Sequence, residues 1–339
     1  MTKFIQYGCG KMSLHTVRFA LECHMQLVGA VDINPAIVGK EFNGVVVTHA
    51  KDFEKLLNET KPDIVIVETM SLLSELEDVL NICAKNGVNA ITTCEEAFYP
   101  IVSNPNLTKK LDELAKAHNC TLTGSGYQDA FWGNLITTIA GATHGITKIK
   151  GSSSYNVEDY GIALAEVHGA GLTLEEFDAK IAAADRISKE ERQKLIESGT
   201  YTPSYMWNVV PWLADKLGLH LIDMTQKCVP LTHDQDIDSS TLKMTVKAGN
   251  ATGMSAIVTG QTSEGITIEA ECIGKVYAPG EVDTNDWTVY GEPDTRIVVT
   301  EPDTVKLTCA TIVNRIPDVI ASEPGFVPTS RMGELKNLR

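Results

Sequence analysis

The sequence predicts an α/β fold in which a doubly wound parallel sheet precedes a second, α+β domain built on a mostly antiparallel sheet. Two observations lead to this prediction. In residues 1–125, strand-like segments alternate with helix-like segments, which is the pattern of right-handed βαβ units. After about Gly124, several strand-like segments alternate polar and apolar residues, as in TLKMTVK and GITIEAE. That alternation is typical of an antiparallel sheet with one covered face.

The first domain is expected to span residues 1–125. Its strands are predicted at short apolar, often β-branched runs, at residues 4–8, 26–32, 63–69, 89–93 and 121–124. Its helices are predicted where apolar residues recur at helical spacing, at residues 12–23, 52–59, 74–86 and 107–118. This order favours a doubly wound parallel sheet.

The second domain is expected to span residues 126–309. Its strands are predicted at residues 148–155, 241–247, 256–261, 265–271 and 304–308, and its helices at residues 173–184, 190–199 and 203–217. Residues 310–339 form a closing segment that begins with a predicted helix at residues 310–321. We expect this segment to return to the first domain.

The composition narrows the class of partner. The 339 residues carry a formal net charge of −15, which repels phosphate backbones and anionic membranes, so neither nucleic acid nor a membrane is expected as a partner. No apolar run approaches the ~18 residues that span a bilayer and no signal peptide is evident, so we expect a cytoplasmic protein. The eight cysteines are scattered and the histidines lack metal-ligand spacing, which predicts reduced thiols and no metal site.

A glycine turn follows the first predicted strand. The residues YGCGKMS read as G-x-G-x-x-S, in which Ser13 is small enough for the helix to pack closely on the strand. Gly8 permits a tight turn, and Gly10 lets the backbone approach a pyrophosphate. The turn continues through Lys11 and Met12 into a helix whose first N–H groups suit an anion. The sequence therefore predicts a Rossmann domain that binds a nicotinamide dinucleotide.

Asp32 ends the second predicted strand and bears on the choice of dinucleotide. A carboxylate at this place can accept hydrogen bonds from the adenosine ribose hydroxyls, although the alternative is a solvated strand end. Asp32 would repel a 2′-phosphate, which favours NAD, whereas Lys11 near the turn leaves NADP open. Thr69 and Met70 follow another strand and are expected to border the cofactor at the carboxyl edge of the sheet.

Two adjacent glutamates, Glu95 and Glu96, follow the strand predicted at residues 89–93. A carboxyl beside the nicotinamide in a partly apolar mouth would have a raised pKa and could act as an acid or base. The alternative is a solvated helix start, where the helix dipole stabilises a glutamate. The residues alone leave both interpretations open.

Several segments together resemble one known family. GCGKM, TTCEEAFYP, GSGYQDAFWGNL, SSSYN and VNRIPDVIASEPGF are similar to the 2,4-diaminopentanoate dehydrogenase and native amine dehydrogenase family, which is dihydrodipicolinate-reductase-like. The resemblance covers essentially the whole chain. The Lys- and His-rich motifs of true dihydrodipicolinate reductases are missing, and so is the Glu-Lys-Pro motif of sugar-type Rossmann oxidoreductases.

The resemblance implies a catalytic glutamate, which we assign to Glu95, with Glu96 as the second choice. It places Asn314 near the nicotinamide. It also implies a substrate pocket lined by Tyr127, Phe131, Trp132, Ile136 and Tyr155. Without the resemblance, Phe131 and Trp132 would be read as ordinary core aromatics, and Tyr155 as an ordinary residue at a strand end.

An amino-acid substrate would need a cation and hydrogen-bond donors for its carboxylate. Arg315, His168 and His233 are candidates by position and residue type. Arg315 is equally suited to a salt bridge at the surface or between domains, and His168 to a structured loop.

The resemblance implies the reversible, NAD(P)-dependent oxidative deamination of 2,4-diaminopentanoate to 2-amino-4-oxopentanoate and ammonia, a step of ornithine degradation. It also suggests a homodimer. One alternative is an amine dehydrogenase of broader specificity, acting on amines or ketones without a carboxylate. Another is a non-catalytic dinucleotide sensor, which would need no carboxyl beside the nicotinamide.

Overall fold

The computed structural model describes residues 1–338, and the chain divides into two compact units. The first unit contains Met1–Leu135, the short segment Ile196–Tyr201 and the chain from Asp303 onward. The second unit contains Ile136–Leu195 and Thr202–Pro302. The divisions fall after Leu135 and before Asp303, whereas the sequence placed them at residues 125 and 310. We describe each unit by itself.

The first unit is built on an eight-stranded sheet with the strand order β16-β7-β6-β5-β1-β2-β4-β3. The strands are β1 (Lys3–Tyr7), β2 (Gln26–Asp32), β3 (Glu41–Phe42), β4 (Val45–His49), β5 (Ile64–Val67), β6 (Asn89–Thr92), β7 (Thr121–Gly124) and β16 (Gly325–Phe326). All neighbours pair in parallel except β3 and β4. All four residues of β5 are buried, as expected for the centre of a parallel sheet covered on both faces.

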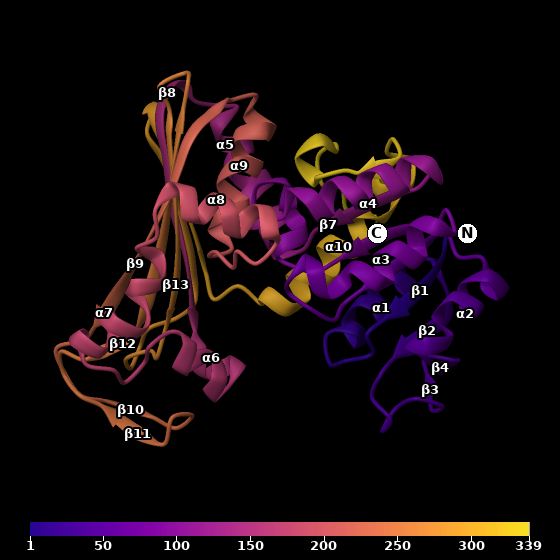
Figure 1. Cartoon of the computed structure of the whole chain (residues 1–339), viewed down its shortest axis with the longest axis horizontal. Coiled ribbons are helices and arrows are strands. Elements are labelled where there is room, and N and C mark those ends of the chain that lie inside the picture. The colour runs from indigo at the N-terminus through magenta and orange to yellow at the C-terminus, as the bar shows by residue number, and fades with distance from the viewer. Residues whose placement is uncertain (339) are drawn as a thin grey trace. The chain divides into compact units, whose positions relative to one another are not determined.

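Helices cover both faces of this sheet. They are α1 (Ser13–Glu22), α2 (Phe53–Thr60), α3 (Glu77–Lys85), α4 (Pro105–Ala117) and α10 (Thr304–Ala321). One buried cluster joins the sheet to α2, α3 and α4, for example through Phe53, Leu80 and Leu111. The other joins it to α1 and α10, for example through Val17 and Ile316. The C-terminal helix, yellow in Figure 1, is thus part of the first unit.

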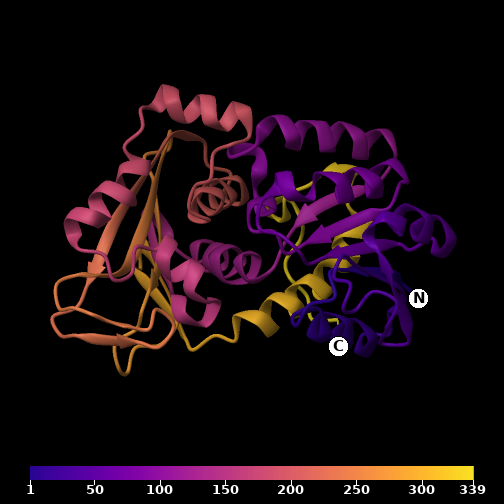
Figure 2. The same ribbon diagram turned by 60° about the horizontal axis from the view of Figure 1, so that its bottom comes forward.

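The second unit is built on a six-stranded sheet with the order β15-β14-β8-β13-β12-β9. Its strands are β8 (His144–Asn156), β9 (Leu221–Thr232), β12 (Ala251–Thr262), β13 (Thr267–Lys275), β14 (Thr284–Glu292) and β15 (Thr295–Thr300). All pairs are antiparallel except β8 with β13. The long strands run side by side in Figures 1 and 2.

The remaining elements complete the chain. The helices are α5 (Leu135–Ala140), α6 (Ile162–Val167), α7 (Leu174–Lys180), α8 (Lys189–Ser198) and α9 (Met206–Leu217). A small separate sheet pairs β10 (Ile237–Ser239) with β11 (Met244–Val246). Helix α9 packs on β12 and β13, where a Cβ on Gly260 would lie 2.6 Å from a methyl of Val210. Within residues 1–338, no helix combines the length and apolar character needed to cross a membrane.

Two strands expected from the sequence have different structures. Residues 304–308 form the first turns of α10 instead of a strand, because Asp303 caps the helix and accepts a hydrogen bond from the backbone N–H of Lys306 at 3.0 Å. The Thr and Val residues of this segment favour a strand locally, and the cap overrides them. Within residues 241–247 only β11 is extended, and it belongs to the small two-stranded sheet.

Replacing Asp303 with Ala should lower the free energy of unfolding by about 1 kcal/mol, because the start of α10 loses its side-chain cap. Denaturant or thermal unfolding measures this effect. Asp303→Asn is the matched control, since Asn also caps helices well. Equal stability of the Ala and Asn variants would show that the cap does not stabilise α10.

Candidate active site

The glycine turn begins where β1 ends. Gly8 has a φ of +93°, and a Cβ added to it would lie 2.3 Å from the carbonyl oxygen of Glu68, so only glycine fits. A Cβ on Gly10 would meet nothing within 4 Å, which leaves open space beside the backbone there. Ser13 Oγ donates to the carbonyl oxygen of Gly10 at 2.8 Å and fixes the turn to the helix.

The first turn of α1 is suited to an anion. Met12 is its N-cap and supplies no side-chain hydrogen bond, and the first turn carries no acidic residue. The exposed Lys11 immediately precedes it. Uncapped N–H groups together with the helix dipole form the usual binding site of a pyrophosphate. The residues of the turn therefore fit a dinucleotide.

Asp32 lies at the end of β2 beside this turn. Its Oδ2 accepts a hydrogen bond from the backbone N–H of Cys9 at 2.8 Å, and its Oδ1 accepts one from Asn34 at 2.7 Å. A carboxylate has about four acceptor positions, so two remain for ribose hydroxyls. The exposed Thr69 and Met70 follow β5, and Thr69 adjoins Gly8.

Glu68 is a functional candidate that the sequence did not identify. Its carboxyl accepts hydrogen bonds from Thr16 Oγ1 at 2.6 Å and Gln6 Nε2 at 3.0 Å, and Gln6 also donates to the carbonyl of Gly8. Burial raises the pKa of Glu68 to about 7, although these hydrogen bonds oppose the shift. An ionisable group thus lies directly behind the glycine turn.

The two adjacent glutamates have different environments. Glu96 is 7% exposed, and its carboxylate accepts hydrogen bonds from the backbone N–H of Leu73 and from Ser103 Oγ, both at 2.7 Å. Burial raises the pKa of Glu96, and both hydrogen bonds oppose this shift. Glu96 thereby ties the segment after β6 to the segments before α3 and α4.

Glu95 remains partly exposed at the carboxyl edge of the sheet. Burial raises the pKa of its carboxyl, and a hydrogen bond with the Ser71 side chain partly opposes the shift. The backbone also brings these segments together, because the N–H of Glu96 donates to the carbonyl of Ser71 at 3.2 Å. Of the two glutamates, Glu95 has the geometry of a group that can exchange a proton with a ligand.

Three predicted pocket residues lie together on the helical segment after β7. Tyr127 stacks on Phe131 with ring centroids 4.5 Å apart, and Trp132 meets Tyr127 edge-on at 5.8 Å. Residues Asp129–Asn134 form a π-helix, a form that often occurs at functional sites. Trp132 Nε1 is buried and has no hydrogen-bond partner within residues 1–338.

The other predicted pocket residues belong to the second unit. Ile136 is buried in α5 and Tyr155 lies at the end of β8. The Tyr155 hydroxyl is 2.6 Å from His168 Nε2, while His168 Nδ1 is 2.8 Å from the carbonyl oxygen of Leu164. These partners assign Nδ1 as the donor and Nε2 as the acceptor.

The candidates for binding a substrate carboxylate require correction. Arg315 is 0% exposed, and its guanidinium is paired with the carboxylates of Asp129 and Asp318, so it is not available to a ligand. His168 is 5% exposed with both nitrogens engaged, and burial lowers its pKa, which makes it a poor partner for an anion. His233 Nδ1 accepts a hydrogen bond from the backbone N–H of Gln235 in a loop of the second unit.

Asn314 has a contact that the sequence did not predict. It lies on α10, and its Oδ1 accepts a hydrogen bond from the backbone N–H of Leu338 at 3.2 Å. The side chain therefore holds the last described residues against the helix. This contact gives Asn314 a structural role in the first unit.

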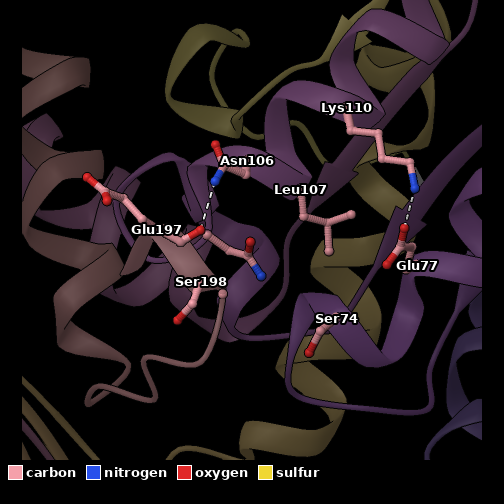
Figure 3. A pocket seen from close by; sticks show the side chains of 9 residues that line it. Ser74, Glu77, Asn106, Leu107, Lys110, Glu197 and Ser198 are labelled. Carbon is pink, nitrogen blue, oxygen red and sulfur yellow. Dashed lines mark hydrogen bonds and ion pairs between the residues drawn. The ribbon is translucent and has the colours of Figure 1, made fainter. Parts of the chain in front are cut away.

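A cavity of about 300 Å³ lies at the beginning of α3 and α4, apart from the residues described above (Figure 3). It is lined by Ser74, Glu77, Asn104, Asn106, Leu107, Lys110, Glu197, Ser198 and Gly199. Lys110 Nζ is 2.5 Å from Glu77 Oε1, and Asn106 Nδ2 donates to the carbonyl oxygen of Glu197 at 2.7 Å. Charges of both signs line the cavity, so it does not favour one class of ligand.

The first unit defines the class of the protein. It contains a parallel sheet, a glycine turn that leads from β1 into a helix without a side-chain cap, and an acidic residue at the end of β2. This is the dinucleotide-binding arrangement of Rossmann dehydrogenases. Residues 132–336 match the family described as the 2,4-diaminopentanoate dehydrogenase C-terminal domain. The chain belongs to this family. It is an oxidoreductase that acts on a CH–NH₂ group and uses a nicotinamide dinucleotide.

Individual relatives agree with this assignment. The chain is 25% identical over 299 residues to 2,4-diaminopentanoate dehydrogenase of Acetoanaerobium sticklandii, a match that covers 84% of this chain and 80% of the relative. The structure of an amine dehydrogenase from Mycobacterium smegmatis is 34% identical, with a TM-score of 0.82 over 99% of this chain and 97% of that one. The scyllo-inositol dehydrogenase of Lactobacillus casei with bound NAD(H) and scyllo-inositol shares the fold alone (14% identity, TM-score 0.56, 97% and 92% coverage).

Gly10→Ala should weaken dinucleotide binding about tenfold, because the new methyl group occupies the open space beside the turn. The melting temperature should not change, since the methyl meets no protein atom. Gly8→Ala provides the contrast, because it should destabilise the fold itself. Fluorescence titration with NAD and NADP measures the affinity. Unchanged affinity in Gly10→Ala would show that the pyrophosphate does not approach Gly10.

Glu68 should make the protein less stable as the pH rises. Its pKa is about 7 in the folded protein against an ordinary value of 4.5, so the folded state retains a proton that the unfolded chain has lost. The stabilisation is complete below pH 4.5 and is lost as the pH rises to about 7. The full loss is about 3 kcal/mol, from roughly 2.5 pKa units at about 1.4 kcal/mol each.

The test compares the pH dependence of unfolding in the wild type and in Glu68→Gln. The difference in the free energy of unfolding between the two proteins should change between pH 4.5 and about 7, because the contributions of all other titrating groups cancel. Glu334→Gln replaces an exposed glutamate and serves as the control. A pH-independent difference between the wild type and Glu68→Gln would contradict the prediction.

Proposed function

We propose that this protein catalyses the reversible NAD-dependent oxidative deamination of 2,4-diaminopentanoate to 2-amino-4-oxopentanoate and ammonia, within ornithine degradation. The observation that carries the proposal is the partly exposed carboxyl of Glu95 at the carboxyl edge of the sheet, with a pKa raised by burial. Its place next to the segment after β5 suits a proton-transfer group beside a dinucleotide. Membership in the family supports the substrate class.

The chemistry asks two tasks of Glu95. When bound, the nicotinamide dinucleotide supplies the hydride acceptor. As the hydrogen on C4 of the substrate leaves with its electron pair, positive charge develops on the iminium, and the carboxylate of Glu95 stabilises it. Glu95 then takes a proton from the water that attacks the iminium carbon. Glu95 then returns this proton to the nitrogen of the carbinolamine, which collapses to the ketone as ammonia leaves and the hydroxyl proton goes to solvent.

NAD is the proposed dinucleotide, because Asp32 offers acceptors to ribose hydroxyls and would repel a 2′-phosphate. The exposed Lys11 is the residue nearest in sequence that offers a cation to such a phosphate. NADP is therefore the second dinucleotide to test.

We propose that the aromatic group on the helix after β7, formed by Tyr127, Phe131 and Trp132, lines the substrate pocket. The stacking of Tyr127 on Phe131, with Trp132 edge-on, supplies an apolar surface for the carbon chain of the substrate. We also propose that the first unit binds the dinucleotide and that the second contributes to substrate binding. We further propose a cytoplasmic homodimer.

An amine dehydrogenase of broader specificity is the second candidate. Arg315 is paired with Asp129 and Asp318, so it is not available to bind the carboxylate of a substrate. The protein is also more similar in sequence to the mycobacterial amine dehydrogenase, at 34% identity, than to the curated diaminopentanoate enzyme, at 25%. Both observations favour a direct comparison of amines with and without a carboxylate.

Dinucleotide reduction at 340 nm, followed at alkaline pH, separates these candidates. The proposed function predicts faster NAD reduction with 2,4-diaminopentanoate than with simple amines that lack the carboxylate. Equal rates would establish the broader amine dehydrogenase. Dinucleotide binding without reduction by any amine would overturn both and leave a non-catalytic sensor.

Glu95→Gln should retain dinucleotide binding and lose at least about 10²-fold in turnover, because the amide cannot accept the proton. Glu96→Gln is the matched variant, since it changes the adjacent carboxyl that holds Leu73 and Ser103. It should lower thermal stability and change turnover much less. Steady-state kinetics and thermal unfolding of both variants provide the measurement. The reverse pattern would transfer the catalytic role to Glu96.

A further inference from the structure

A buried ion pair holds Asp129, which lies on the same helical segment as Phe131 and Trp132. Asp129 and Arg315 are both 0% exposed, and the guanidinium binds the carboxylate through two contacts, Nε to Oδ2 at 2.7 Å and Nη2 to Oδ1 at 3.2 Å. Arg315 comes from α10, so the pair joins the two ends of the first unit. Removing one partner of such a pair strongly destabilises the folded protein, because the other charge stays buried without compensation.

Every acceptor position of the Asp129 carboxylate is used. Besides Arg315, Ser125 Oγ donates to Oδ2 at 2.8 Å and Asn134 Nδ2 donates to Oδ1 at 2.8 Å. With two hydrogen bonds on each oxygen, the carboxylate has no capacity left for a ligand. Its role is therefore to hold its neighbours in place.

These contacts span the π-helix from its first residue to its last. Asn134 Nδ2 also donates to the backbone carbonyl of Asp129 at 2.8 Å, across the five-residue interval that defines a π-turn. The Asn134 side chain thus closes the wide turn from outside, while Arg315 and Ser125 fix its first residue.

The π-helical turn, which is wider than an α-helical one, determines which side chains lie on the same face of the helix. In an α-helix, residues three and four positions apart are neighbours, whereas residues five positions apart diverge. Here Tyr127 contacts both Phe131, four positions on, and Trp132, five positions on. A regular helix would rotate Trp132 away from Tyr127, so the three rings lie together because the segment is a π-helix.

We propose that Asp129 and Arg315 are positioning residues, whose buried ion pair holds the π-turn and thereby sets the arrangement of Tyr127, Phe131 and Trp132 toward the substrate. The proposal rests on the proposed function in one respect, the assignment of these aromatic residues to the substrate pocket. A displacement of about 1 Å near the reacting groups can cost as much as 10²-fold in rate, so a small change of the turn is measurable.

The kinetic test compares Asp129→Asn with Asp318→Asn. The first variant disturbs the π-turn, whereas the second removes a carboxylate 3.0 Å from the same guanidinium without touching the turn. Asp129→Asn should lower kcat/KM for the amine about tenfold or more. It should also alter the amine ratio, which is kcat/KM for a small amine divided by kcat/KM for a bulky one. Its KM for the dinucleotide and the kinetics of Asp318→Asn should remain within about twofold of wild type.

Asn134→Ala covers the case in which Asp129→Asn does not fold. It removes both hydrogen bonds from the Asn134 side chain to Asp129 and leaves the ion pair intact, so it should change the amine ratio in the same direction. A merely structural ion pair would lower the melting temperature and leave the amine ratio unchanged. An unchanged ratio in folded Asp129→Asn or Asn134→Ala would overturn the proposal.

A spectroscopic readout separates failure of this proposal from failure of the proposed function. The emission of wild type minus Trp132→Phe isolates the Trp132 indole, and the same subtraction in the Asn134→Ala background shows whether the indole has moved. We expect a shifted maximum and altered acrylamide quenching. An unchanged difference spectrum would overturn the positioning role even if the protein deaminates no amine. A shifted one would support it independently of activity.

Discussion

The contact between Gly8 and the backbone of Glu68 is the constraint on which the first unit depends. No side chain fits between the end of β1 and the end of β5, so the two strands meet closely and the chain turns sharply into α1. The turn leaves the start of α1 uncapped and brings Asp32, at the end of β2, to the N–H of Cys9. The dinucleotide edge of the sheet follows from this one close approach.

The same edge shows how neighbouring, chemically identical residues acquire different environments. Glu96 is held by two donors and connects loops, whereas Glu95 keeps an exposed portion and one bond to a hydroxyl. Both carboxyls are raised in pKa by burial, so the pKa shift does not distinguish them. The two carboxyls differ in their exposure to a ligand, and this exposure depends on how the segment after β6 folds.

Much of the first unit could be predicted from the sequence, because the apolar strands and the glycine turn are local signals. The family assignment was confirmed by the comparisons. The pairing of Arg315 with Asp129 could not be predicted, since Asp129 is 186 positions away in the chain. Strands β9, β14 and β15 of the second unit were missed, and each of them carries several polar residues. The π-helix has no periodic signature in the sequence.

The insertion of the second unit into the first has a consequence for synthesis on the ribosome. The nascent chain completes β1 to β7 before the inserted unit, but α10 and β16 emerge only after it. Until then, the sheet face that α1 and α10 share lacks the contribution of Ile312 and Ile316, and Asp129 lacks its partner Arg315. The inserted unit can fold on its own sheet first, as domains generally do. The first unit therefore cannot complete its packing until α10 and β16, which follow the inserted unit, have been made.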